Sequence, residues 1–81
     1  MKNENAKYER IRDMRIERDI TQKCAAQKLS IAQNTLSQYE NGLRNVPNGI
    51  LAAMALLYET STDYLLGLTD EPAPYKRANG R

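Results

Sequence analysis

Residues 30–42, SIAQNTLSQYENG, constrain the fold of this chain more than any other stretch. At helical spacing, one side of the stretch is apolar and carries Ile31, Leu36 and Tyr39. The opposite side carries only uncharged hydrogen-bonding groups, on Gln33, Asn34, Ser37 and Gln38. Solvated helix faces are usually built from Glu and Lys, which favour both helix and solubility. An amide-rich face therefore indicates either a short polar helix without a partner or a surface that makes paired hydrogen bonds.

The composition excludes several classes of protein. With 81 residues the chain forms one small domain, and its 41% of hydrophobic residues include neither Phe nor Trp. A single cysteine and no histidine exclude a disulfide framework, the usual zinc-finger patterns and histidine-based acid–base catalysis. The sequence has no nucleophile–base pair and no phosphate-binding loop, so we expect no enzyme, metal site or cofactor. Cys24 is most simply a small, partly buried hydrophobic residue.

The sequence has no pattern typical of a membrane span or a signal peptide. No apolar run approaches the roughly 18 residues that a span needs, and the first residues, MKNENAKYER, lack an apolar segment. We therefore expect a cytoplasmic protein with no membrane partner and no small-molecule ligand. The net charge of +2 neither requires nor excludes nucleic acid. Residues 21–50 are weakly basic, with three cations and one anion, whereas residues 51–81 have three cations and four anions.

The apolar periodicity predicts an all-α fold made of short helices. The first helix is expected over residues 6–19. Thr21 is a candidate N-cap for a second helix over residues 22–29, and a tight connection leads to a third over about residues 32–41. Gly42 suits the end of that third helix. Two short helices joined closely, the second with a polar outer face, form the helix-turn-helix pattern.

Two more helices are predicted in the second half of the chain. Pro47 suits the first position of a fourth helix, which is almost entirely apolar and should form the centre of the bundle. Ser61 or Thr62 caps a short fifth helix over residues 63–67. The C-terminal residues have no apolar period and include two prolines. The chain is thus expected to divide into a flexible N-terminus, a helical domain and a flexible tail or linker start, at residues 1–5, 6–68 and 69–81.

Four short motifs, in order and at matching spacing, resemble the Cro/repressor-like (XRE) family of DNA-binding domains. They are RDMR at residues 12–15, TQ at 21–22, LSQYENG at 36–42 and STDYLLG at 61–67. The resemblance covers about residues 8–68. This chain departs from the family pattern at Ala25 and Ala26, where the family has Leu-Ala, and at Ser30, where it has a turn glycine. The implied fold is a compact, lambda-repressor-like bundle of five short helices, with the second and third forming the helix-turn-helix.

The resemblance implies sequence-specific binding of duplex DNA by a small bacterial or phage transcriptional regulator, with the third helix in the major groove. Because amides can bond bidentately to adenine, the implied base readers are Gln33, Asn34, Gln38 and, more weakly, Ser37. The implied phosphate contacts are Gln22, Lys23, Asn41 and Arg44, with Lys28 as a further candidate. A free solvated charge is the competing interpretation of each lysine. Arg15 and Glu40 are implied to form a partly buried ion pair between the first and third helices.

Apolar residues in the C-terminal part of the domain indicate that a second copy of the chain is a partner. Tyr64, Leu66 and Leu68 are more apolar groups than one short turn buries, which favours a homodimer on a pseudo-palindromic DNA site. In the competing interpretation Tyr64 and Leu65 only cover the core of a monomer. An antitoxin-like or protein-interaction module, with DNA binding secondary, also fits the sequence.

Overall fold

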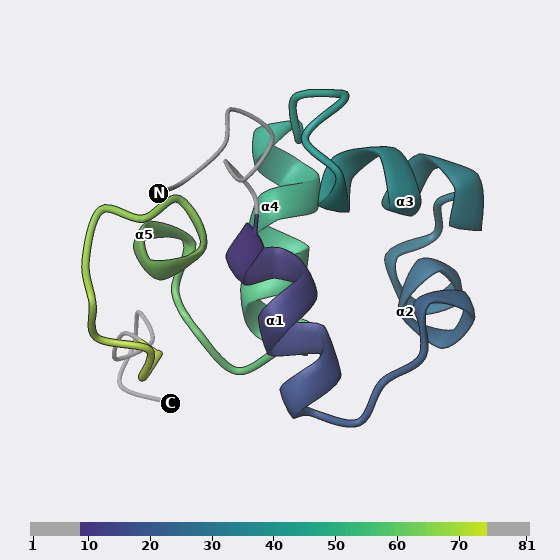
Figure 1. Ribbon diagram of the computed structural model, residues 1–81. Helices are drawn as coiled ribbons and strands as arrows, with labels where there is room; N and C mark the ends of the chain where they lie inside the picture. Colours follow the sequence, from purple (N-terminus) through teal and green to yellow (C-terminus); the bar gives the residue numbers. More distant parts are fainter. Residues whose placement is uncertain (1–8, 75–81) are drawn as a thin grey trace.

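The computed structural model describes residues 9–74, and five helices occupy most of this range. They are α1 (Glu9–Glu17), α2 (Gln22–Leu29), α3 (Gln33–Glu40), α4 (Asn48–Leu57) and α5 (Thr62–Leu65). Residues 9–74 contain no β-strand, and the predicted all-α fold of five short helices is confirmed. In Figure 1, α2 and α3 lie together on one side, α5 lies on the opposite side, and α1 and α4 lie between them. The expected flexible N-terminus and the final part of the expected tail, residues 1–5 and 75–81, lie outside the described residues.

Short-range hydrogen bonds set the starts of three helices. Thr21, the predicted N-cap of α2, accepts a hydrogen bond from the Cys24 N–H at 3.1 Å. Ser61 caps α5 through the equivalent bond at 3.0 Å. Pro47 differs from its prediction by one position, because it precedes α4 rather than opening it. Its extended backbone, with ψ of 151°, suits an N-cap, and its carbonyl accepts the first helical hydrogen bond from Leu51.

The five helices of the described range all end in the same way. The chain passes through one left-handed residue, and the next N–H bonds to a carbonyl five positions back. The left-handed residues are Asp19, Ser30, Gly42, Glu59 and Gly67. A left-handed conformation costs a non-glycine residue about 1–2 kcal/mol, so three of these ends form against a local penalty. The first helix accordingly ends at Glu17 rather than at residue 19, and residues 6–8 of its predicted range lie outside the described part.

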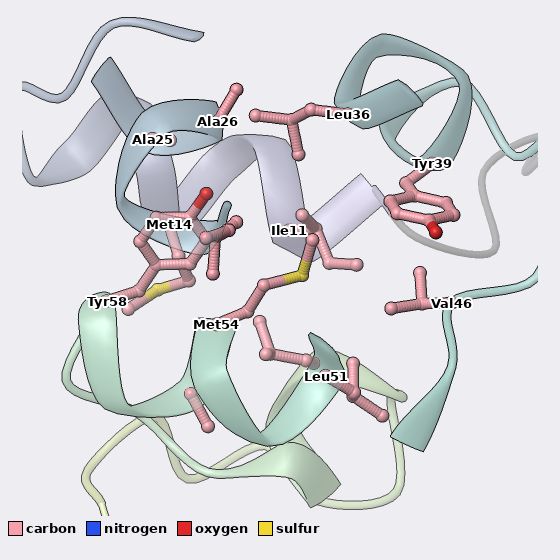
Figure 2. Close-up of a cluster of buried hydrophobic side chains, with 13 residues drawn as sticks. Ile11, Met14, Ala25, Ala26, Leu36, Tyr39, Val46, Leu51, Met54 and Tyr58 are labelled. Carbon is pink, nitrogen blue, oxygen red and sulfur yellow. The ribbon is translucent and has the colours of Figure 1, made fainter. Parts of the chain in front are cut away.

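The core collects side chains from every helix (Figure 2). Completely buried side chains include Ile11 of α1, Leu36 of α3, Met54 of α4 and Leu65 of α5. α2 contributes the buried Ala25 and Ala26. Because alanine is small, α2 packs closely against both α3 and α4. The alanine pair that departs from the family pattern therefore helps to place α2.

The hydroxyl of Tyr58, just after α4, is buried and has no hydrogen-bond partner among residues 9–74. Burial raises the pKa of Tyr58 to about 12, the Glu40 carboxylate adds to the rise, and Arg15 opposes it. A buried hydroxyl without a partner costs about 1–3 kcal/mol relative to a satisfied one. We therefore expect that removing the Tyr58 hydroxyl does not destabilise the fold.

Residues 69–74, the described part of the expected tail, contact the helical domain. The Arg10 guanidinium of α1 donates a hydrogen bond to the Thr69 carbonyl at 2.6 Å. The hydroxyl of Thr60, a buried residue after α4, donates to the Pro72 carbonyl at 2.6 Å. The beginning of the segment expected to be flexible is thus tied to α1 and to the end of α4.

Candidate nucleic-acid interface

α3 presents one apolar face and one polar face. Leu36 and Tyr39 are buried, and Ile31, just before the helix, packs against the core. The polar face carries Gln33 and Asn34, which are exposed, and Ser37 and Gln38, which are partly exposed. This uncharged face is therefore accessible to a ligand that offers hydrogen-bonding groups of its own.

The N-termini of α2 and α3 are electrostatically compatible with an anion. Neither helix has an acidic residue in its first turn, and Ala32 precedes α3 without a side-chain cap. The free N–H groups at a helix start carry a partial positive charge and bind phosphate readily. The first turns of the two helices thus suit a negatively charged ligand such as a phosphate backbone.

An ion pair connects α1 to the last residue of α3. The Arg15 Nε atom lies 2.7 Å from Glu40 Oε2, and Nη2 lies 3.2 Å from Oε1. The Glu40 side chain is only 2% exposed and that of Arg15 is 12% exposed. Arg15 also donates to the Ile20 carbonyl at 2.9 Å. Because a charge buried without its partner is costly, this pair holds α3 in a defined position on α1.

Two glutamines extend the ion pair to the polar face of α3. Gln22, the first residue of α2, donates from Nε2 to Glu40 Oε1 at 3.1 Å. Gln33, the first residue of α3, donates from Nε2 to Gln22 Oε1 at 3.3 Å. A chain of hydrogen bonds therefore leads from the buried carboxylate, through the partly exposed Gln22, to the exposed Gln33.

Residues of the loop after α3 lie beside the same polar face. Arg44 Nη1 donates to Gln38 Oε1 at 3.4 Å, and the guanidinium carbon lies 5.7 Å from the centre of the Tyr39 ring. Asn41 Nδ2 lies 3.5 Å from Ser37 Oγ. Arg44 and Asn41 are exposed, so a cation and an amide border the face of α3.

The remaining predicted site residues are not part of this group. Lys23 and Lys28 of α2 are exposed. Tyr64 is half-buried, whereas Leu66 and Leu68 are 39% and 72% exposed. These last three belong to α5 and the residues after it, on the side of the molecule away from α2 and α3 (Figure 1).

Two long-range contacts had no signal in the sequence. The bond from Gln22 to Glu40 joins residues 18 positions apart. The Arg10 guanidinium lies 4.2 Å from the centre of the Tyr64 ring and donates to the Tyr64 carbonyl at 3.0 Å, across 54 positions. Helical periodicity reports only which face is buried, so it cannot pair side chains that tertiary packing brings together.

Two short helices joined by residues 30–32, the second with an exposed polar face, define a helix-turn-helix domain. The chain belongs to the helix-turn-helix family, whose sequence model matches residues 11–65. This match confirms the resemblance drawn from the sequence motifs.

Two regulators of Bacillus subtilis (strain 168) are similar to this chain. One, described as the uncharacterized HTH-type transcriptional regulator YobD, is 38% identical over 66 residues, covering 82% of this chain and 59% of that protein. The other, the HTH-type transcriptional regulator ImmR, is 45% identical over 58 residues, covering 72% of this chain and 46% of that protein. The chain thus spans about half the length of the curated relatives that it matches.

None of the helices within residues 9–74 combines the length and apolar character needed to cross a membrane. The described part of the chain also has no group of three or more His, Cys, Asp and Glu side chains arranged to hold a metal ion. Cys24 is a free, partly buried thiol.

Proposed function

We propose that this domain binds duplex DNA sequence-specifically, as part of a small cytoplasmic transcriptional regulator, with α3 in the major groove. The observation that carries the proposal is the uncharged, accessible amide face of α3. The helix-turn-helix family and the names of the two similar regulators support the same function. They also favour it over the protein-interaction module that the sequence left open.

The polar residues divide into base readers and backbone contacts. Amides of Gln33, Asn34 and Gln38 can each bond bidentately to adenine, and the Ser37 hydroxyl can donate or accept. Arg44 and Asn41 border this face and suit phosphate groups on either side of the groove. Lys23 adds a second exposed cation at the start of α2, and the Gln22 N–H lies at the same helix start.

The test begins by selecting bound duplexes from a random pool, which yields the preferred site and its symmetry. Gln33→Ala or Gln38→Ala should then lose about 1–3 kcal/mol at particular base pairs. Arg44→Ala should weaken binding to all sequences alike and reduce the salt-dependence slope by about one. Gln27→Ala is a matched control, because it removes an exposed amide from α2. An unchanged site preference in both α3 variants would show that α3 does not read the bases.

A homodimer is the second part of the proposal. The weakly basic face gains affinity if two domains bind one site, and a two-fold pair would place two α3 helices about 34 Å apart. Leu66 and Leu68 are exposed apolar side chains that a second copy could cover. Tyr64 is already engaged by Arg10 within its own chain, so it would contribute at most its outer edge.

Sedimentation across micromolar concentrations tests the dimer. Leu66→Lys and Leu68→Lys should shift the protein toward monomer and weaken binding to palindromes more than to half-sites. Ile16→Lys is the control, since Ile16 is an exposed apolar residue of α1. A wild-type protein that stays monomeric and binds half-sites as tightly as palindromes would contradict the dimer.

A further inference from the structure

We propose that the buried Glu40 is a positioning residue for base recognition, because its carboxylate sets the orientation of Gln22 and, through it, of Gln33. This role rests on the proposed DNA-binding function. Glu40 is 5% exposed, so it would act on the choice of base without touching DNA.

The orientation of Gln22 follows from the chemistry of its neighbour. An ionised carboxylate only accepts hydrogen bonds, so the Gln22 atom at 3.1 Å from Glu40 Oε1 must be the amide nitrogen. The Gln22 oxygen then points to Gln33, which must donate from its own nitrogen at 3.3 Å. Arg15 holds the Glu40 carboxylate in place through two hydrogen bonds.

This order of donors decides what Gln33 can offer to DNA. One N–H of Gln33 is used on Gln22, which leaves the Gln33 oxygen and one N–H free. An acceptor beside a donor complements adenine, whose major-groove edge offers the N6 donor and the N7 acceptor. The geometry therefore assigns Gln33 a preference for adenine over guanine, because guanine offers two acceptors, N7 and O6.

Glu40→Gln should reverse the chain of amides. The new amide keeps its oxygen at the shorter contact, 2.7 Å from Arg15 Nε, and gives up the longer contact, 3.2 Å, between Arg15 Nη2 and the position of Oε1. Its NH2 group then faces Gln22, which must turn its oxygen inward and its nitrogen toward Gln33. Gln33 would accept from Gln22 and present two free N–H groups, which suit guanine.

The experiment compares base preference in the selected site for the wild type, Gln33→Ala, Glu40→Gln and Gln22→Met. Gln33→Ala identifies the base pair that Gln33 reads. At that pair Glu40→Gln should change the preference from adenine toward guanine. Gln22→Met should reduce the adenine preference about 5- to 150-fold, the range that one bidentate contact supplies. Gln27→Met, the same change at an exposed site of α2, should leave it unaltered.

A second readout does not depend on DNA. In nuclear magnetic resonance spectra of the free protein, the side-chain NH2 protons of Gln22 should exchange with water more slowly than those of Gln27. Gln22→Met should speed the exchange of the Gln33 NH2 protons. It also keeps the Arg15–Glu40 pair, so it tests the proposal even where Glu40→Gln is too unstable to fold.

The outcomes separate the two proposals. A wild-type protein that enriches no sequence would overturn the DNA-binding function and, with it, the role of Glu40 in base choice. The second outcome is a clear site at which Gln33 discriminates between bases equally well in the wild type and in folded Gln22→Met. This result would overturn the positioning role alone. Equal exchange rates for the Gln22 and Gln27 side chains would overturn it as well.

Discussion

Two arginines of the same helix, Arg10 and Arg15, hold opposite sides of the molecule. Within the described range, residues 9–74, each guanidinium donates three hydrogen bonds and each reaches one carboxylate. The side chain of Glu40, paired with Arg15, is 2% exposed, whereas that of Asp70, paired with Arg10, is 99% exposed. The number of hydrogen bonds is the same, and the main difference between the two contacts is the burial of the acidic partner.

The physical reason lies in the partner that remains when one side chain is removed. A buried charge without its partner keeps the full cost of leaving water, while an exposed charge returns to water. The Arg15 contact should therefore be essential for the helix-turn-helix, and the Arg10 contact should only fasten α5 and residues 69–74. Four measurements test this difference.

The largest effect is expected from breaking the buried pair. Arg15→Met and Glu40→Met should each lower the free energy of unfolding by roughly 3–5 kcal/mol, because each leaves the opposite charge buried. The double variant should cost less than the two single costs combined. Denaturant melts of all four proteins provide the cycle, and strict additivity would mean that the two side chains do not interact.

The pH dependence of stability tests the surroundings of Tyr58, whose pKa is raised mainly by burial and also by the charge of Glu40. Its folded-state pKa of about 12 lies above the ordinary 10.0, so the folded protein holds this proton more tightly than the unfolded chain. The stability that this raised pKa contributes is complete below pH 10 and is lost as the pH rises to about 12. The free energy of unfolding should fall by roughly 2–3 kcal/mol over that range.

Tyr58→Phe should lack this part of the alkaline destabilisation. At neutral pH it should be at least as stable as the wild type, because it removes a buried hydroxyl that has no partner. Melts of both proteins at several pH values from 9 to 12 measure the difference. Parallel curves would show that Tyr58 titrates normally.

The Arg10 contact should have a smaller effect. Arg10→Met removes hydrogen bonds to two carbonyls and the stacking on Tyr64, and should cost about 1–2 kcal/mol. Asp70→Asn, which removes only the exposed charge, should not shift the melting midpoint measurably. If Asp70→Asn were as damaging as Arg10→Met, the ion pair rather than the carbonyl contacts would hold residues 69–74.

The smallest effect concerns the turn between α2 and α3. Ser30 is left-handed, with φ of 59°, at a position where the family has glycine. Ser30→Gly should raise the free energy of unfolding by about 0.5–1 kcal/mol, since relief of the left-handed strain exceeds the added flexibility of the unfolded chain. Thermal melts measure the change. A loss of stability would mean that the Ser30 side chain supports the turn.

Local features of the sequence determined much of the fold. Thr21 and Ser61 cap α2 and α5, because a side-chain oxygen close to a helix start can accept from its free N–H groups in any context. The alternation of apolar and polar residues around Leu36 and Tyr39 placed the buried and exposed faces of α3. The Arg15–Glu40 pair, in contrast, was expected only from the family resemblance, because nothing local joins residues 25 positions apart.

Only the tertiary structure decided the contacts that join helices. Ser30 and Glu59 adopt left-handed conformations that their side chains disfavour, because the packed helices on either side require a turn there. The sequence marked Gln22 and Gln33 as polar, but their order as donor and acceptor depends on Glu40, which folding brings within 3.1 Å of Gln22. A residue type limits which hydrogen bonds a side chain can make, whereas its buried neighbours determine which of them it makes.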